Sequence, residues 1–250
     1  MTSKTDYVRR LGDNVLVLSQ RLSEWCGKGP ALEEDMALIN VSLDLIGQAR
    51  LWLSYAGELE GQGRSEDQLA FLRDAHQFHN LLLVELPNGS YADTLARQFL
   101  FDVWHYFLLQ GLGQSDDARI VEIAQKCLKE VTYHVRRSTD LVIRLGDGTE
   151  ESHRRMQAAI DDLWMYTGEL FTPDALDTAM QQQGLAPALD ELQQKWQQHV
   201  TEVLQLATLR IPAAGLWMQS GGKQGRHTEH LGYLLAEMQF LQRSYPGAAW

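Results

Sequence analysis

The segment from Asp116 to Leu145 carries the pattern that most restricts how this chain can fold. Its core-type residues alternate between spacings of four and three, at Ile120, Ala124, Cys127, Val131, His134, Ser138, Leu141 and Leu145. An α-helix turns once every 3.6 residues, so residues spaced in this way share one face. The segment therefore predicts a long helix that ends at Gly146 and packs against other helices.

Similar stretches recur along the chain and are separated by Gly, Pro and Asn turn residues. No alternating strand pattern of useful length interrupts them. We expect helices over residues 5–25, 33–60, 66–85, 91–112, 116–145, 149–170, 186–207 and 228–243. A short further helix should follow Thr172-Pro173-Asp174, with Thr172 as its N-cap. The sequence thus predicts an all-α protein, and the lack of a linker or repeat predicts a single domain over 1–250.

Composition excludes several classes of partner. The net charge is −11, and Lys and Arg are scattered, which argues against binding to nucleic acid or to an anionic membrane. No stretch approaches the roughly 18 apolar residues of a membrane span. Residues 1–10 lack the apolar core of a secretory signal, and Cys26 and Cys127 lie far apart in sequence, so we expect a cytoplasmic location.

Polar residues on the expected inner helix faces invite comparison with the di-metal site of ferritin-like bundles. Such a site needs a Glu from each of two helices and a Glu-x-x-His from each of two others. Asp102 and His105 have the pair spacing, but Glu130 is followed at i+3 by Tyr133, and Asp44 is followed at i+3 by Gly47. We therefore expect Asp44, Asp102, His105, Glu130 and His134 to form a structural polar cluster, with no metal cofactor in this chain.

Two other segments have more than one interpretation. Residues 73–80 combine amide, imidazole and aromatic groups, which suit either a ligand or an ordinary solvated helix face. Residues 221–230 form a flexible basic segment that resembles an anion-binding loop, although a turn with Thr228 as helix N-cap explains them as well.

Several motifs together resemble the structural, non-catalytic C subunit of the bacterial phenylacetyl-CoA 1,2-epoxidase. They are Leu11-Gly12-Asp13-Asn14, Leu43-Asp44-Leu45-Ile46-Gly47-Gln48-Ala49-Arg50, Glu85-Leu86-Pro87-Asn88-Gly89, Lys129-Glu130-Val131-Thr132-Tyr133-His134 and the run from Gly221 to Gly232. The resemblance spans nearly the whole chain. It implies a ferritin-like helical bundle with additional C-terminal helices.

The resemblance also implies a role. The C subunit of that complex supports a homologous catalytic subunit that holds a di-iron centre, and the complex uses a reductase and dioxygen to epoxidise phenylacetyl-CoA. The C subunit has lost the metal ligands, in keeping with Gly47 and Tyr133. The resemblance assigns contacts with the CoA end of the substrate to Gln77, Phe78, His79, Asn80, Thr178, Ala179 and Met180, although His79 stands where a smaller polar residue is expected.

Two alternatives remain open from the sequence. The first is a ferritin-like metalloenzyme that works alone, with Asp44, Asp102, His105, Glu130 and His134 as ligands. The second is a helical scaffold for another partner. The incomplete ligand set disfavours the first alternative, and only the resemblance disfavours the second.

Overall fold

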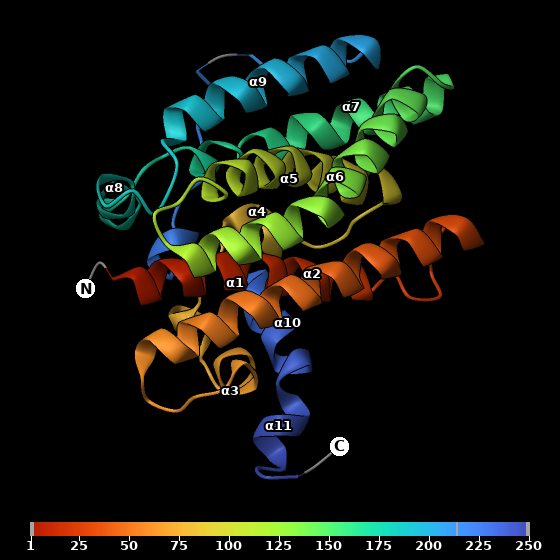
Figure 1. The fold of residues 1–250 in the computed structure, drawn as a ribbon. Helices are drawn as coiled ribbons and strands as arrows, with labels where there is room; N and C mark the ends of the chain where they lie inside the picture. Colours follow the sequence, from red (N-terminus) through yellow and green to blue (C-terminus); the bar gives the residue numbers. More distant parts are fainter. Residues whose placement is uncertain (1–2, 214, 249–250) are drawn as a thin grey trace. The chain divides into compact units, whose positions relative to one another are not determined.

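The computed structural model describes residues 3–213 and 215–248. All regular structure in these residues is helical, which confirms the all-α prediction (Figure 1). None of the described helices combines the length and the apolar character that crossing a bilayer requires. The chain divides into two compact units, one made of residues 1–87 and 221–250 and the other of residues 88–220.

The first unit is built on a pair of helices. Helix α1 (Lys4–Ser23) packs along α2 (Leu32–Glu60), and α3 (Glu66–Phe71), η1 (Ala75–Gln77) and α4 (Leu82–Glu85) follow. The chain returns to this unit with η3 (Gly222–Gln224), α10 (Glu229–Met238) and α11 (Phe240–Ser244). Helix α10 contacts α1, α4 and η1, so the core of the unit contains residues from both ends of the sequence.

The second unit is built around α5 (Tyr91–Leu112). Helices α6 (Ala118–Gly146), α7 (Glu150–Trp164) and α9 (Leu189–Leu206) all pack against α5, and η2 (Gly168–Leu170) and α8 (Ala175–Gln182) lie between α7 and α9 in the chain. Two Trp side chains anchor this packing. Trp196 of α9 donates a hydrogen bond to the carbonyl of Leu100 (3.0 Å), and Trp104 of α5 donates one to the carbonyl of Leu170 (3.3 Å).

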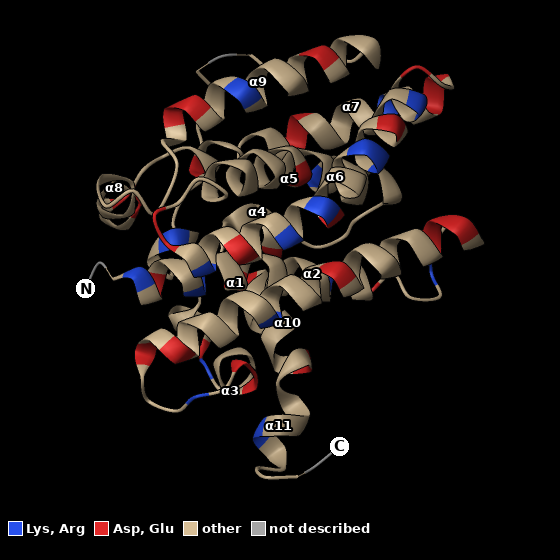
Figure 2. Ribbon diagram, viewed as in Figure 1, with Lys and Arg blue, Asp and Glu red and all other residues tan. Residues whose placement is uncertain are grey.

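Local sequence sets most helix ends. Ser3, Ser65, Ser90 and Thr149 each begin a helix with a capping box, in which side chain and backbone bond reciprocally over three residues. Gly61 ends α2 in the left-handed region (φ 66°), where glycine is favoured. Figure 2 shows acidic and basic residues intermingled on helices such as α1, α6, α7 and α9, which fits the scattered Lys and Arg of the sequence.

Four predictions of helix boundaries need correction. The helix expected over 66–85 is broken into α3, η1 and α4, and the helix expected over 149–170 ends at Trp164, before the 3₁₀ turn η2. Helix α8 begins after Asp174 rather than Thr172, because the Asp174 side chain accepts the backbone N–H of Asp177 (2.8 Å). The helix expected over 228–243 divides at Gln239 into α10 and α11. The other expected helices are confirmed to within a few residues.

Helices α1 and α2 come closest at Gly12. A Cβ atom at this position would lie 2.8 Å from Leu53 Cδ2 and 3.3 Å from Trp52 Cβ, and all three residues are buried. Gly47 lies on the exposed side of α2, where a Cβ would meet no atom within 4 Å.

These two glycines predict opposite effects of substitution. Gly12→Val should lower the free energy of unfolding by about 1–3 kcal/mol, because a branched side chain overpacks the helix contact. Gly47→Ala should raise it by about 0.5–1 kcal/mol, because alanine is the better helix former. Urea unfolding of both variants measures the difference, and a Gly12→Val variant as stable as the natural chain would contradict the close packing.

Candidate ligand-binding site

Helix α1 holds the segment that joins α3 to α4. The buried carboxylate of Asp13 forms an ion pair with Arg73, with 3.0 Å between Nη1 and Oδ2, and accepts the backbone N–H of His79 at 3.0 Å. Asn14 accepts the backbone N–H of Leu81 at 2.8 Å. The side chains of Asp13 and Asn14 therefore accept hydrogen bonds from two backbone N–H groups. In a continuous helix, these N–H groups would donate to the carbonyls four residues earlier. This explains why the expected helix ends at Phe71.

The buried side chain of Arg73 holds the loop between α3 and α4 in place. Its guanidinium donates to the carbonyl of Gln77 (3.0 Å) and lies 4.1 Å from the ring centroid of Phe78, a cation–π distance. The Arg73 side chain is only 3% exposed, so its charge is held among protein groups. Such a buried pair is costly to break, because either partner alone would leave an uncompensated charge.

The four residues from 77 to 80 differ in what they present to a ligand. Phe78 and Asn80 are fully buried in the first unit, Gln77 is exposed and His79 is half-buried. The Gln77 amide oxygen accepts the backbone N–H of Asp74 (2.8 Å), which keeps its side chain close to the loop. Contact of all four residues with CoA stays a prediction. Of these four side chains, only those of Gln77 and His79 are accessible to a ligand. The buried side chains of Phe78 and Asn80 anchor the loop that carries them.

The returning C-terminal segment is fastened to the same loop by His227. Its Nε2 donates to the carbonyl of Phe78 (2.9 Å) and its Nδ1 lies 2.7 Å from Glu85 Oε2. Glu85 also accepts bonds from Asn80 Nδ2 (2.9 Å) and the backbone N–H of Thr228 (2.5 Å). We call His227, Glu85, Asn80 and Thr228 the His227 clasp.

The geometry of the His227 clasp favours the imidazolium form. Burial alone would lower the pKa of His227, but the hydrogen bond and the charge of Glu85 raise it above its usual value. Both ring nitrogens face acceptors, which an imidazolium satisfies with two donors. As expected, Thr228 is the N-cap of α10, since its hydroxyl accepts the N–H of His230 (3.3 Å).

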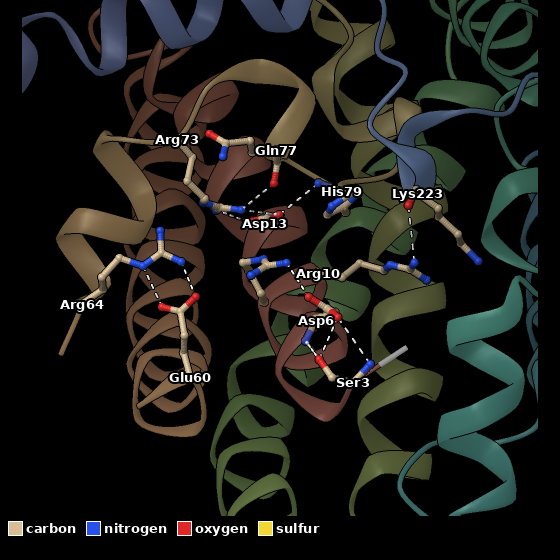
Figure 3. Close-up of polar contacts among 11 residues, drawn as sticks. Ser3, Asp6, Arg10, Asp13, Glu60, Arg64, Arg73, Gln77, His79 and Lys223 are labelled. Atoms are coloured by element: carbon tan, nitrogen blue, oxygen red, sulfur yellow. Dashed lines mark hydrogen bonds and ion pairs between the residues drawn. The ribbon is translucent and has the colours of Figure 1, made fainter. Parts of the chain in front are cut away.

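Positive charge gathers around His79 (Figure 3). Burial lowers the pKa of His79, and the charges of Arg9, Arg10 and Arg73 lower it further against the opposing effect of Asp13. Arg10 donates to the backbone carbonyl of Lys223 (3.4 Å), which brings the η3 segment to the same place. We call these residues the basic cluster: Arg9, Arg10, Arg73, His79 and Lys223.

Two carboxylates pair with arginines of the basic cluster. Asp6 pairs with Arg9 at 2.6 Å, and Asp13 pairs with Arg73. The basic cluster brings Arg and Lys side chains together on a chain whose net charge is −11. Arg and Lys side chains gathered in this way can bind anionic ligands. Next to the exposed amide of Gln77, the basic cluster suits an anion that also offers hydrogen-bonding groups.

The sequence did not reveal the basic cluster or the His227 clasp. Arg9 and Arg10 lie in the first expected helix and Lys223 more than 200 positions later, so no sequence window contains them together. The only signal was the basic, glycine-rich segment 221–230. A Cβ on Gly222 would collide with the carbonyl oxygen of Asn80, so glycine is required for that close approach.

Thr178, Ala179 and Met180 lie on α8, in the second unit. The Thr178 hydroxyl is exposed and donates to the carbonyl of Asp174 (3.0 Å), Ala179 is half-buried, and Met180 is fully buried. Their contact with CoA stays a prediction, and Thr178 is the residue with a polar group at the surface.

The predicted polar cluster is assembled in part. Asp102, His105 and His134 are buried within the second unit, and Gln98 donates to Asp102 at 2.6 Å. Burial raises the pKa of Asp102 to about 6, although nearby His134 favours its charged form. Burial and the charge of His134 lower the pKa of His105 to about 3. Burial therefore disfavours the charged forms of Asp102 and His105.

Asp44 and Glu130 differ from these three. Both are half-buried, Asp44 on α2 of the first unit and Glu130 on α6 of the second, and Tyr133 is 51% exposed. Across 3–213 and 215–248, no three His, Cys, Asp or Glu side chains come together in a way that could hold a metal ion. The donor set thus does not fit a carboxylate-bridged di-metal centre, which needs at least four acids and two histidines. The absence of a cofactor in this chain stays a prediction.

Comparison with known proteins places this fold in a family. The sequence profile of the phenylacetic acid catabolic proteins matches residues 1–250. The chain belongs to this family. It is also 52% identical to the C subunit of 1,2-phenylacetyl-CoA epoxidase from Escherichia coli strain K12, over all 250 residues and the full length of both proteins.

Membership of the phenylacetic acid catabolic proteins confirms the family expected from the sequence motifs. It also confirms the fold class, because proteins of this family are ferritin-like helical bundles. Helices α8 to α11 follow in the C-terminal part of the chain, where the sequence predicted further helices.

Asp102 should make the stability of this family member depend on pH. Unfolded aspartate ionises near pH 3.8 and folded Asp102 near pH 6, so the folded chain binds more protons between these values and stability falls as pH rises. Asp102→Asn should therefore stabilise the chain at pH 8, by up to about 3 kcal/mol, and change little at pH 4. Urea unfolding at both pH values measures this. Asp140→Asn, exposed on α6, is the control, and an equal gain at both pH values would contradict the assignment.

The His227 clasp predicts a second pH dependence. A histidine whose folded pKa is raised stabilises the fold fully below its unfolded pKa, and this contribution is lost as pH rises through the folded pKa. His227→Gln should therefore destabilise the chain more at pH 6 than at pH 9. Thermal unfolding of both proteins at the two pH values tests this, with exposed His76→Gln as the control. A cost that is the same at both pH values would mean that His227 is neutral in the clasp.

Proposed function

We propose that this chain is a supporting component of a phenylacetyl-CoA 1,2-epoxidase, equivalent to the C subunit of the Escherichia coli enzyme. The observation that carries the proposal is 52% identity over the full length of both chains. Such identity without gaps in coverage is expected when two proteins occupy the same place in the same complex. The partner is then a homologous catalytic subunit, which binds two iron atoms and receives electrons from a separate reductase.

Residues of both units support a role for this chain without metal chemistry of its own. The positions that would complete a ligand pair hold Gly47 and Tyr133, and neither offers an acid or imidazole. Asp102, His105 and His134 are left as a small buried group, and burial disfavours the charged forms of Asp102 and His105. In this proposal they give the helix pair α5 and α6 a defined register, as buried polar groups do in other bundles.

The basic cluster supports a role in binding the CoA end of the substrate. CoA carries phosphates and an adenine at the end far from the phenylacetyl ring, and both can interact with Arg, Lys and amide groups. Exposed Gln77 lies beside the basic cluster, to which half-buried His79 belongs, and the Asp13–Arg73 pair and the His227 clasp hold both residues in place. Binding of the remote end contributes to catalysis when it positions the reacting end.

The test is made in the reconstituted complex. Gln77→Ala with His79→Ala should lower kcat/KM for phenylacetyl-CoA at least about fivefold, roughly 1 kcal/mol, while the chain still co-purifies with the di-iron subunit. Asn80 is left unchanged, because its amide bonds Glu85 in the buried clasp. Gln205→Ala, exposed on α9, is the matched control and should have natural kinetics.

The outcomes separate the two parts of the proposal. Natural kinetics of the double variant would remove residues 77 and 79 from the CoA site and leave the supporting role intact. Failure of the natural chain to co-purify with a di-iron catalytic partner would overturn the supporting role itself. Epoxidation by this chain alone, after loading with ferrous iron, would show that it is catalytic.

A further inference from the structure

Helix α2 is apolar on two opposite sides. Its inner side is buried in the first unit, with Leu38, Val41, Leu45 and Trp52 each no more than 1% exposed. Large apolar residues also lie on its outer side, where Leu32, Met36, Leu43 and Ile46 are 72, 56, 60 and 41% exposed. Figure 2 shows the long uncharged stretches of this helix between its acidic ends. A helix that is apolar all round is usually covered on every side.

The outer residues follow the spacing of a coiled coil. We call them the α2 seam: Leu32, Met36, Ile39, Leu43, Ile46 and Arg50. Their spacings are four, three, four, three and four, which are the core positions of a heptad repeat. The seam covers five helical turns, roughly 27 Å of helix at 1.5 Å per residue. This spacing predicts packing against another helix, rather than scattered surface residues.

A groove of about 450 Å³ runs beside the seam. Leu43, Ile46 and Gly47 of α2 form one side, and Glu66, Asp67, Ala70 and Phe71 of α3 form the other. Because a Cβ on Gly47 would meet no atom within 4 Å, this position is open to a side chain from outside. The seam therefore combines protruding side chains at one end with a recess at the other.

We propose that the α2 seam binds the α2 seam of a second copy of this chain, with the two helices antiparallel. The seam positions are symmetric about residue 41. A twofold axis there sets Leu32 against Arg50, Met36 against Ile46 and Ile39 against Leu43 of the other copy. Each Met36 then lies over the groove beside Gly47 of the second copy, and a flexible methionine fills such a recess well.

The charged and polar residues beside the seam favour this occupant over another helix. Glu33, exposed at one end, comes next to Arg50 of the second copy, whose side chain is 76% exposed. Asn40 is exposed near the twofold axis, where its amide meets its own equivalent and can both donate and accept. A polar residue in such a seam specifies register and orientation. The seam is thus complementary to itself in its apolar pattern and in the pairing of Glu33 with Arg50.

The buried area of the proposed interface sets the expected affinity of the dimer. One helix pair of this length with its groove buries on the order of 1,000 Å² in total, at the low end for specific interfaces. The dimer should accordingly be weak and depend on concentration. Light scattering after size exclusion should give twice the chain mass of 28.4 kDa at high protein concentration and fall towards that mass on dilution.

Substitutions in the seam test the proposal. Leu43→Lys should make the chain monomeric without changing its circular dichroism or melting temperature, since Leu43 is 60% exposed. Tyr233→Lys, at a residue 74% exposed on α10, is the matched control and should remain dimeric. Glu33→Arg and Arg50→Glu should each raise the dimer Kd about tenfold, and the double variant should restore it.

The double variant with Glu33→Arg and Arg50→Glu distinguishes an ion pair between two copies from an ion pair within one chain. Arg50 lies 3.2 Å from Glu66 in the same chain. If that were its whole role, adding Glu33→Arg to Arg50→Glu would not restore dimerisation, and the antiparallel arrangement would be wrong.

Cross-linking fixes the register. In a Cys26→Ser background, Asn40→Cys should be joined to its equivalent by a short bis-maleimide. Glu58→Cys on the same helix should not, because the two sites would lie ~50 Å apart along antiparallel helices.

Three results would overturn the proposal. They are a monomer at all concentrations up to about 100 µM, a dimer that Leu43→Lys leaves intact, or a monomer whose Leu43→Lys variant loses only its binding to the catalytic partner. The last result would assign the seam to that partner. It would leave the role proposed for the chain standing, and the two proposals therefore fail separately.

Discussion

The buried pair of Asp13 and Arg73 is the contact on which the candidate site depends. A charged pair with almost no exposed surface has one arrangement that satisfies it, because every alternative leaves a charge without water or partner. Asp13 is placed by the regular turn of α1, and Arg73 comes with the end of α3. The pair therefore holds an irregular loop in a fixed position against a long helix. Gln77 and His79 hold fixed positions on that loop, although no regular element contains His79.

The helices were predictable because their information is local. Periodic apolar residues, Ser and Thr caps and glycine stops lie within a few positions of each helix they define, and helices such as α2, α5 and α6 match their expected bounds closely. The break at Phe71 was not predictable in this way. Residues 66–85 are compatible with a helix. The break comes from Asp13 and Asn14, which accept the backbone N–H groups of His79 and Leu81, 66 and 67 positions later in the chain.

The same distinction applies to the site residues. Family resemblance pointed to the loop from 77 to 80, but burial decides which of its side chains can meet a ligand. Phe78 and Asn80 point into the unit because Arg73 and Glu85 bind them there, and neither partner is evident from spacing. Apart from the basic segment 221–230, the scattered Lys and Arg of the sequence suggested no anion site. In the folded unit α1 and η3 bring Arg10 and Lys223 together. Arg9 and Arg10 lie far from Lys223 in sequence, so local composition alone could not show that they come together.

The first unit is completed by the end of the sequence. Residues 221–250 belong to it together with residues 1–87, and His227, Thr228 and His230 all bond groups between positions 21 and 85. During synthesis, the loop carrying Gln77 and His79 therefore lacks its contacts with His227 and Thr228 until the whole second unit has been translated. Until then Glu85 has neither His227 nor Thr228, and a buried carboxylate without these partners is costly. The second unit is continuous in sequence and needs no such delay, so the order of translation favours a chain whose α5–α9 unit is folded before its ligand loop is fixed.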